Sequence, residues 1–130
     1  MNIVIGTHGR FGEELVNSAQ MIAGTMDNVT CFSLLPEMSF EEFMNDADQT
    51  IAKMEGPVIA LVDLFGGTPC NVLTALSKKH HYDVITGVNL PMLIDLHLKS
   101  TSVETSDVST LIKETIQTLQ ESAVHTNEKL

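Results

Sequence analysis

The sequence lacks any long apolar run. Hydrophobic residues make up 43% of the 130 residues, yet no run reaches the roughly 18 consecutive apolar residues that a membrane-spanning helix needs. The first residues, Met1 to Gly6, have no basic flank and no small-residue cleavage site, which is typical of a strand rather than a signal peptide. We therefore expect a soluble cytoplasmic protein, with residues 1–130 forming one domain.

Basic residues are scarce. Seven Lys and Arg stand against 17 Asp and Glu, which gives a formal charge of -10 at pH 7. This charge repels the phosphates of nucleic acids and the surfaces of anionic membranes. Nucleic acid and membrane lipid are therefore poor partner candidates.

The usual signatures of metal and nucleotide sites are also missing. Cys31 and Cys70 form no CxxC pair and have no His at zinc-ligand spacing, so we interpret them as buried reduced thiols. The sequence has no GxxxxGK(S/T) loop and no GxGxxG after its first strand, which disfavours a nucleotide kinase or a dinucleotide enzyme. We expect neither a metal nor a cofactor. Of the remaining His and Met residues, we expect His80 and His81 to be solvated at a helix end, His97 and His125 to have no site role, and Met21, Met26, Met44 and Met54 to pack in the core.

Short β-branched and aliphatic runs predict four buried strands, at residues 2–6, 29–34, 58–63 and 83–87. Apolar residues at three- and four-residue spacing predict helices at 11–23, 39–54, 69–79, 91–98 and 107–124. We expect residues 99–106 to form a polar connector and residues 125–130 to be frayed or paired with something outside the core.

Helix start signals support this assignment. Ser39 followed by Glu42 predicts a capping box, and Thr68 followed by Pro69 predicts an N-cap and a proline at the first helical position. Strands that alternate with helices predict an open, doubly wound α/β fold, with a mainly parallel sheet and helices on both faces. In such folds ligands bind beyond the carboxyl ends of the strands, where the strand order reverses.

Two predicted loops at that edge carry chemistry. His8 follows the first strand, in Gly6-Thr7-His8-Gly9-Arg10, and Asp63 ends the third strand. If these strands are neighbours, Asp63 can accept a hydrogen bond from Nδ1 of His8 and leave Nε2 as a nucleophile. The alternative, a capping or core-edge histidine, is the ordinary reading for a lone His, but the flanking glycines and the turn after Asp63 favour the nucleophile.

A phosphoryl group on Nε2 would need hydrogen-bond donors. Gly66, Gly67 and Thr68, which precede Pro69 at a predicted helix start, can supply backbone N–H groups and a hydroxyl. Further candidates for phosphate contacts are Thr7, Arg10 and Asn89. Arg10 is equally well explained as a solvated loop residue, and Asn89 as a residue that satisfies local backbone groups before a helix.

Three ordered motifs resemble the mannose-type enzyme IIA components of the bacterial sugar phosphotransferase system. They are Ile-Val-Ile-Gly-Thr-His-Gly at 3–9, Val-Asp-Leu-Phe-Gly-Gly-Thr-Pro-Cys-Asn at 62–71 and Gly-Val-Asn-Leu-Pro-Met-Leu at 87–93. The resemblance implies that His8 is the phosphorylated histidine, Asp63 its hydrogen-bonded partner and residues 66–68 the loop that faces the phosphate.

The resemblance also implies the partners. Such proteins accept the phosphoryl group from the histidine-containing phosphocarrier protein (HPr) and pass it to a IIB component, which serves a membrane IIC/IID complex. They are homodimers that exchange a C-terminal strand, although residues 122–130 have only a weak strand pattern here. Two other readings stay open, a phosphotransfer subunit of a dihydroxyacetone kinase and a non-catalytic α/β module that binds an anion. The sequence does not identify the sugar.

Overall fold

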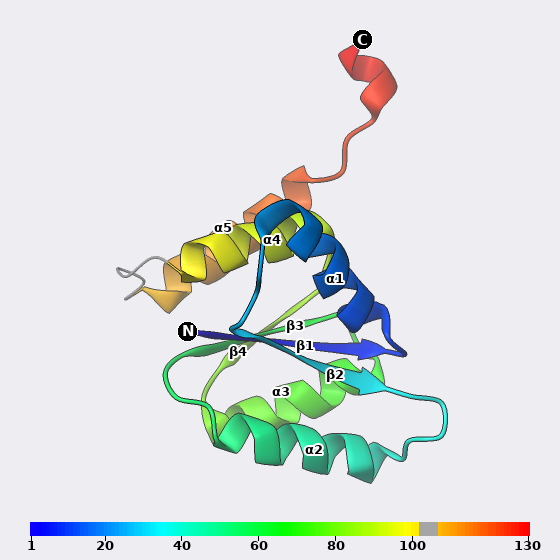
Figure 1. Ribbon diagram of the computed structural model, residues 1–130, viewed down its shortest axis with the longest axis vertical. Helices are drawn as coiled ribbons and strands as arrows, with labels where there is room; N and C mark the ends of the chain where they lie inside the picture. Colours follow the sequence, from blue (N-terminus) through cyan, green and yellow to red (C-terminus); the bar gives the residue numbers. More distant parts are fainter. Residues whose placement is uncertain (102–106) are drawn as a thin grey trace.

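The computed structural model describes residues 1–101 and 107–130, in which strands and helices alternate (Figure 1). The elements are β1 Asn2–His8, α1 Phe11–Ala23, β2 Val29–Leu34, α2 Phe40–Ala52, β3 Val58–Val62, α3 Thr68–His80, β4 Asp83–Thr86, α4 Leu90–Ser100, α5 Val108–Glu121 and a final 3-10 turn, η1 Thr126–Lys129. Each predicted strand and helix is present, with ends shifted by a few residues. The last α-helix ends at Glu121, three residues before the predicted end at 124. His8 lies inside β1 and Lys99 and Ser100 lie inside α4, so the predicted connector begins later than expected; residues 102–106 lie outside the described residues.

The four strands form one parallel sheet in the order β2-β1-β3-β4. Strand order reverses at β1, because the chain first adds β2 on one side and then β3 on the other. The β1–β3 pairing ends at Gly6 and Val62, whereas the β1–β2 pairing continues to His8 and Leu34. The predicted adjacency of the first and third strands is confirmed, and the switch point lies at the end of β1.

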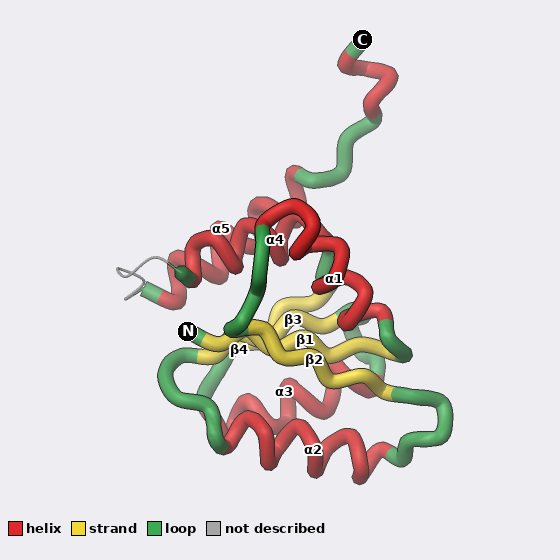
Figure 2. Tube along the Cα trace, in the orientation of Figure 1, coloured by secondary structure: helices red, strands yellow, loops and turns green. Residues whose placement is uncertain are grey.

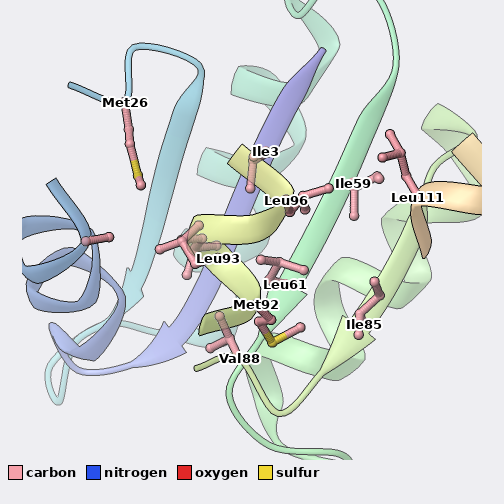
Figure 3. Close-up of a cluster of buried hydrophobic side chains, with 12 residues drawn as sticks. Ile3, Met26, Ile59, Leu61, Ile85, Val88, Met92, Leu93, Leu96 and Leu111 are labelled. Carbon is pink, nitrogen blue, oxygen red and sulfur yellow. The ribbon is translucent and has the colours of Figure 1, made fainter. Parts of the chain in front are cut away.

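Helices cover both faces of the sheet, as the predicted doubly wound fold requires (Figure 2). Alternate strand residues point to opposite faces, so each face has its own core. Ile3, Ile5, Ile59 and Leu61 pack with Leu93 and Leu96 of α4 (Figure 3). The strand residues that point to the other face, which include Val4, Ala60 and Val62, pack against α2 and α3. They form a second cluster with Phe43 of α2 and Val72 of α3. Burial on both faces fixes the strand register, and with it the positions of the strand ends.

Some predictions about single residues are wrong. Met21 is 88% exposed on α1, whereas Met26 is buried and Met44 and Met54 are half-buried beside the core. A three- and four-residue period marks the inner face of a helix but does not fix where that face ends, and Met21 lies on the outer side of α1. Cys70 is buried as predicted, whereas Cys31 is only half-buried.

The end of the chain leaves the body of the molecule. After α5, residues 123–130 extend away from the sheet and its helices (Figure 1), and residues 126–129 form η1 where the sequence has a weak strand pattern. In the described ranges, every helix is too short or too polar to cross a bilayer.

Candidate active site

His8 is the last residue of β1, and Asp63 is the first residue after β3. Both faces of β1 are covered, so Thr7 is completely buried, whereas His8 is exposed at the carboxyl end of the strand. The side chain of His8 is 49% exposed, and that of Asp63 is 14% exposed. The sheet therefore presents an imidazole to solvent and sets a largely buried carboxylate behind it.

One carboxylate oxygen of Asp63 holds His8 at two points. Asp63 Oδ2 accepts a hydrogen bond from the backbone N–H of His8 at 2.9 Å, and it lies 2.9 Å from Nδ1 of the ring. An ionised carboxylate only accepts hydrogen bonds, so Nδ1 carries the proton and Nε2 of the neutral ring keeps its lone pair. The predicted pair is brought together in the arrangement that a nucleophilic Nε2 requires.

The second oxygen of Asp63 is an exception to the usual pairing of buried polar atoms. Asp63 Oδ1 is buried and has no hydrogen-bond partner among the described residues. Leaving such an atom unpaired costs roughly 1–3 kcal/mol. An unpaired buried acceptor is typical of sites where function rather than stability sets the geometry.

Gly67 is the N-cap of α3 and lies against the ring of His8. A Cβ at this position would lie 2.7 Å from His8 Cε1, so only glycine lets the helix start approach the ring so closely. The preceding Gly66 has a φ of +83°, which favours glycine for a different reason, namely the left-handed turn that leads into the helix. Thr68, predicted as the N-cap, is instead the first helical residue.

The turn and the helix together define the charge beside the ring. The N–H of Gly67 donates to the carbonyl of Leu64 at 3.1 Å and closes the turn. The N-terminus of α3, with its partial positive charge, lies beside the edge of the imidazole. This position suits an anion bound to the ring.

The three further candidates are engaged in local contacts. The buried Thr7 Oγ1 accepts a hydrogen bond from the N–H of Gly12 at 2.9 Å and so ties the start of α1 to β1. The guanidinium of Arg10 lies 3.2 Å from the carboxylate of Glu13.

Asn89 caps α4: its side-chain oxygen accepts from the N–H of Met92 at 3.1 Å, and its amide donates to Ser122 at 2.9 Å. These contacts support the local, structural reading of Asn89.

Two polar pairs outside the site could not be predicted. His80 Nε2 lies 2.7 Å from Asp48 Oδ1, and Lys79 donates to Asp48 Oδ2 at 3.0 Å, so His80 is not the solvated residue that we expected. The hydrogen bond from His80 and then that from Lys79 lower the pKa of Asp48. His97 is buried and lies 3.2 Å from the Asn28 side-chain oxygen.

Nucleophilic chemistry concentrates on His8. Burial, followed by the charge of Glu13, raises the pKa of Cys31 to about 11, so this thiol is unreactive near neutral pH. Within residues 1–101 and 107–130, no group of three His, Cys, Asp or Glu side chains is placed to hold a metal ion. The fold and the site define an α/β protein with a half-exposed histidine that is oriented by a carboxylate beside a helix N-terminus.

Comparison with known proteins identifies the family. Residues 2–117 match the family model described as PTS system fructose IIA component, where PTS is the phosphotransferase system. The PTS system mannose-specific EIIAB component of Escherichia coli is 38% identical over 96 residues, which cover 72% of this chain and 30% of that protein. The PTS system fructose-specific EIIA component of Bacillus subtilis is 29% identical over 99 residues, which cover 74% of this chain and 68% of that protein.

A solved structure agrees over nearly the whole chain. The phosphotransferase system component EIIA from Streptococcus agalactiae superposes with a TM-score of 0.89 at 28% identity, covering 98% of each chain. The chain therefore belongs to the mannose-type family of IIA components of the sugar phosphotransferase system, whose members are phosphotransferase proteins. These matches do not favour the dihydroxyacetone kinase subunit or the non-catalytic module. The chain spans 30% of the length of its E. coli relative.

Proposed function

We propose that residues 1–130 form one IIA domain that carries a phosphoryl group on Nε2 of His8. The observation that supports this most directly is the 2.9 Å contact between His8 Nδ1 and Asp63 Oδ2, because it leaves Nε2 as the free ring nitrogen on a half-exposed side chain. The family places the reaction in sugar uptake, and we locate the protein in the cytoplasm, where the phosphotransfer partners are expected.

The transfer is a substitution at phosphorus. The lone pair of Nε2 attacks in line, the Nε2–P bond forms, and the P–N bond to the phosphohistidine of the donor breaks, with the electron pair returning to the donor imidazole. The ring of His8 gains positive character as the bond forms. Asp63 stabilises that charge through Nδ1–H and keeps the ring oriented. Transfer to the acceptor reverses the same steps.

The start of α3 stabilises the phosphoryl group. Gly67 admits the ring to the helix N-terminus, where the helix dipole and the hydroxyl of Thr68 favour negative charge. Gly66 provides the turn that places this helix start. Thr7 acts at a distance by holding the β1–α1 turn, and Arg10, paired with Glu13, is a secondary source of positive charge. We leave Asn89 out of the phosphate-facing group because both ends of its amide are occupied.

We assign the partners from the family. HPr is the phosphoryl donor, and a IIB component is the acceptor, which serves a membrane IIC/IID complex. Mannose, fructose and sorbose appear in the names of its relatives and describe those proteins, so we assign no particular sugar to this chain.

The test of this function is intact-mass analysis after incubation with phosphoenolpyruvate, enzyme I and HPr. One added phosphoryl group is expected on the wild-type chain and none on His8→Ala, which keeps the backbone N–H that binds Asp63. A binding module would show no covalent phosphate. Phosphorylation of His8→Ala at the wild-type rate would contradict the assignment.

We also propose that the protein is a homodimer in which the tail, residues 123–130, is exchanged. β4 is one of the two edge strands of the sheet, and a groove of about 530 Å³ runs beside it, lined by residues of α3, β4 and α5 that include Thr74, Val84 and Ile116. An open sheet edge accepts an added strand. The tail, which leaves the body of its own subunit (Figure 1), is long enough to supply one.

Sedimentation distinguishes the dimer models. The full chain should sediment as a dimer, and a chain that ends at Ser122 should sediment as a monomer with an unchanged circular dichroism spectrum of the body. If the shortened chain remains a dimer, the interface lies elsewhere and the exchange is wrong.

A further inference from the structure

Arg10 places a positive charge where the local backbone does not favour one. It is the N-cap of α1, whose first turn also holds Glu13 and Glu14. The partial positive charge of a helix N-terminus disfavours a guanidinium beside it. Arg10 is also the single Lys or Arg among residues 1–52. A cation at this position is therefore stabilised only by an anion close by.

The anion that Arg10 contacts is Glu13. Nη1 of Arg10 lies 3.3 Å from Oε1 and 3.2 Å from Oε2 of Glu13, whereas strong charge-assisted hydrogen bonds measure about 2.7–2.9 Å. The side chains of Arg10 and Glu13 are 65% and 40% exposed. Exposed ion pairs of this kind are weak. Arg10 can therefore leave Glu13 when a stronger anion is within reach.

Glu13, in contrast, is fixed to the sheet. Its Oε2 accepts a hydrogen bond from Oγ of Ser33 at 2.6 Å. Ser33 lies on β2 in register with Thr7, one residue before His8. The pKa of Cys31, which burial and then the charge of Glu13 raise, places the same carboxylate near this part of β2. Of the two members of the ion pair, Arg10 is the one that can move.

A phosphoryl group on His8 is the stronger anion. Arg10 follows His8 by two residues, so their Cα atoms are at most about 7 Å apart, a distance that the long side chain of arginine can bridge. The phosphoryl group carries about -1.5 to -2 at pH 7 and three acceptor oxygens. A guanidinium binds phosphate through two parallel hydrogen bonds, whereas both contacts with Glu13 come from the single nitrogen Nη1.

We propose that Arg10 is a switch residue, which pairs with Glu13 while His8 is unmodified and with the phosphoryl group once His8 is loaded. Glu13, anchored by Ser33, is then a positioning residue that competes with the phosphoryl group for Arg10. The exchange breaks the two contacts of Nη1 with Glu13 and forms hydrogen bonds from the guanidinium to phosphoryl oxygens, and no covalent bond changes in it. This proposal rests on the proposed function, because it assumes that His8 carries the phosphoryl group.

The competition sets how tightly the site holds the phosphoryl group. A carrier must bind this group strongly enough to accept it and weakly enough to pass it on. Arg10 stabilises the loaded state, and Glu13 offsets part of that stabilisation because the ion pair must separate first. When the phosphoryl group leaves, Glu13 takes Arg10 back. Glu13 therefore keeps the loaded and unloaded states closer in free energy than Arg10 alone would.

The test measures the ionisation of the phosphoryl group itself. The full chain is loaded with phosphoramidate, a small phosphoryl donor, and the pKa of the phosphoryl group on His8 is read from its phosphorus NMR shift at a series of pH values. Arg10→Gln should raise this pKa by about 0.5–1 unit, because a nearby cation favours the more highly charged form. Glu13→Gln should lower it by about 0.2–0.7 unit, the effect of releasing Arg10 from an exposed ion pair.

A double-mutant cycle shows whether Glu13 acts through Arg10. In the Arg10→Gln background, Glu13→Gln should shift the phosphoryl pKa by less than half of its effect in the wild-type chain. Glu14→Gln is the matched control, because it removes the same charge from the same helical turn. Glu14 accepts a hydrogen bond from Asn17 at 3.4 Å, so its loss does not release Arg10, and it too should give less than half of the Glu13→Gln shift.

The same competition should appear in the equilibrium with HPr. Glu13→Gln should raise the equilibrium constant for phosphoryl transfer from HPr to His8 about two- to fivefold, which corresponds to the strength of an exposed ion pair. Arg10→Gln should lower this constant, and the double variant should match Arg10→Gln. An equilibrium constant that Glu13→Gln lowers would contradict the proposal.

The outcomes separate the switch from the proposed function. If neither phosphoramidate nor phosphorylated HPr modifies His8, the proposed function itself fails. If His8 is loaded but Arg10→Gln leaves the phosphoryl pKa unchanged, Arg10 does not reach the group and the switch is overturned. It is also overturned if Glu13→Gln shifts this pKa equally with and without Arg10, because Glu13 would then act by its own charge.

Discussion

Gly67→Ala separates the position of the His8 ring from the stability of the fold. Gly67 has a φ of -73° and a ψ of 165°, which any residue adopts, so alanine causes no backbone strain. The added Cβ would instead meet His8 Cε1 at 2.7 Å and the Leu64 carbonyl oxygen at 3.4 Å. The second contact is tolerable, so the ring must move.

The size of the effect follows from what the ring loses when it moves. Turning the ring off its rotamer costs about 0.5–1.5 kcal/mol, and losing the hydrogen bond to Asp63 costs about 0.5–1.5 kcal/mol more. The new methyl group also has two local effects that oppose each other. It lowers the entropy of the unfolded chain, which stabilises the folded protein by about 0.4–1 kcal/mol. It also makes a poorer N-cap, which destabilises the folded protein by about the same amount. We expect a loss of about 1–3 kcal/mol in unfolding free energy and a roughly 10²-fold slower phosphoryl acceptance, since a misplacement near 1 Å has effects of that order.

A double-mutant cycle with His8→Ala makes this prediction specific. In the His8→Ala background the methyl group meets no ring, so Gly67→Ala should change the free energy of unfolding by less than about 1 kcal/mol. Denaturant unfolding of the four proteins gives the coupling, and single-turnover transfer from phosphorylated HPr gives the rate. If Gly67→Ala accepts phosphate at the wild-type rate, or if the cycle shows no coupling, the ring does not lie against the start of α3.

Other expected outcomes follow from single contacts. Asp63→Asn should slow single-turnover transfer by roughly 10² to 10⁴, because an amide no longer holds the required tautomer; an unchanged rate would make Asp63 purely structural. Thr7→Val should cost about 1–3 kcal/mol in denaturant unfolding, because it leaves the N–H of Gly12 without its acceptor; a cost near zero would show that this bond does not hold the turn. Because His80 and Lys79 lower the pKa of Asp48 below 3.8, the pair should stabilise the fold above that pH and lose its effect as the pH falls through the lower, folded value. Asp48→Asn should then show a flatter acid unfolding curve, and an identical curve would refute the coupling.

The elements of the fold could be predicted from the sequence because they depend on local patterns. Alternating strands and helices predicted the parallel sheet, and the usual doubly wound strand orders placed β1 beside β3. That adjacency is what brings Asp63, 55 residues away in sequence, to the ring of His8. The contact between His8 and Asp63 could be predicted because both residues stand at strand ends, where the topology sets their position.

The remaining contacts depend on packing between helices, which no local pattern encodes. The pair formed by Asp48 and His80 joins α2 to α3 and requires their relative rotation. The N-cap of α3 is Gly67 rather than Thr68 because the close approach to the His8 ring requires a residue without a side chain, which overrides the preference for threonine. Asn89 offered two readings of equal weight, and only the position of Ser122 on the neighbouring helix end decides between them.

The placement of His8 inside β1 affects how the protein responds to heat. A nucleophile on a loop loses its geometry when the loop loosens, often well below the melting temperature of the body. Here the backbone of His8 pairs with β2, and its N–H donates to Asp63, so its position is maintained by the same hydrogen bonds that hold the sheet together. Thermal inactivation and thermal melting of this protein should therefore follow one curve, and thermostable relatives should need no separate adaptation at the nucleophile.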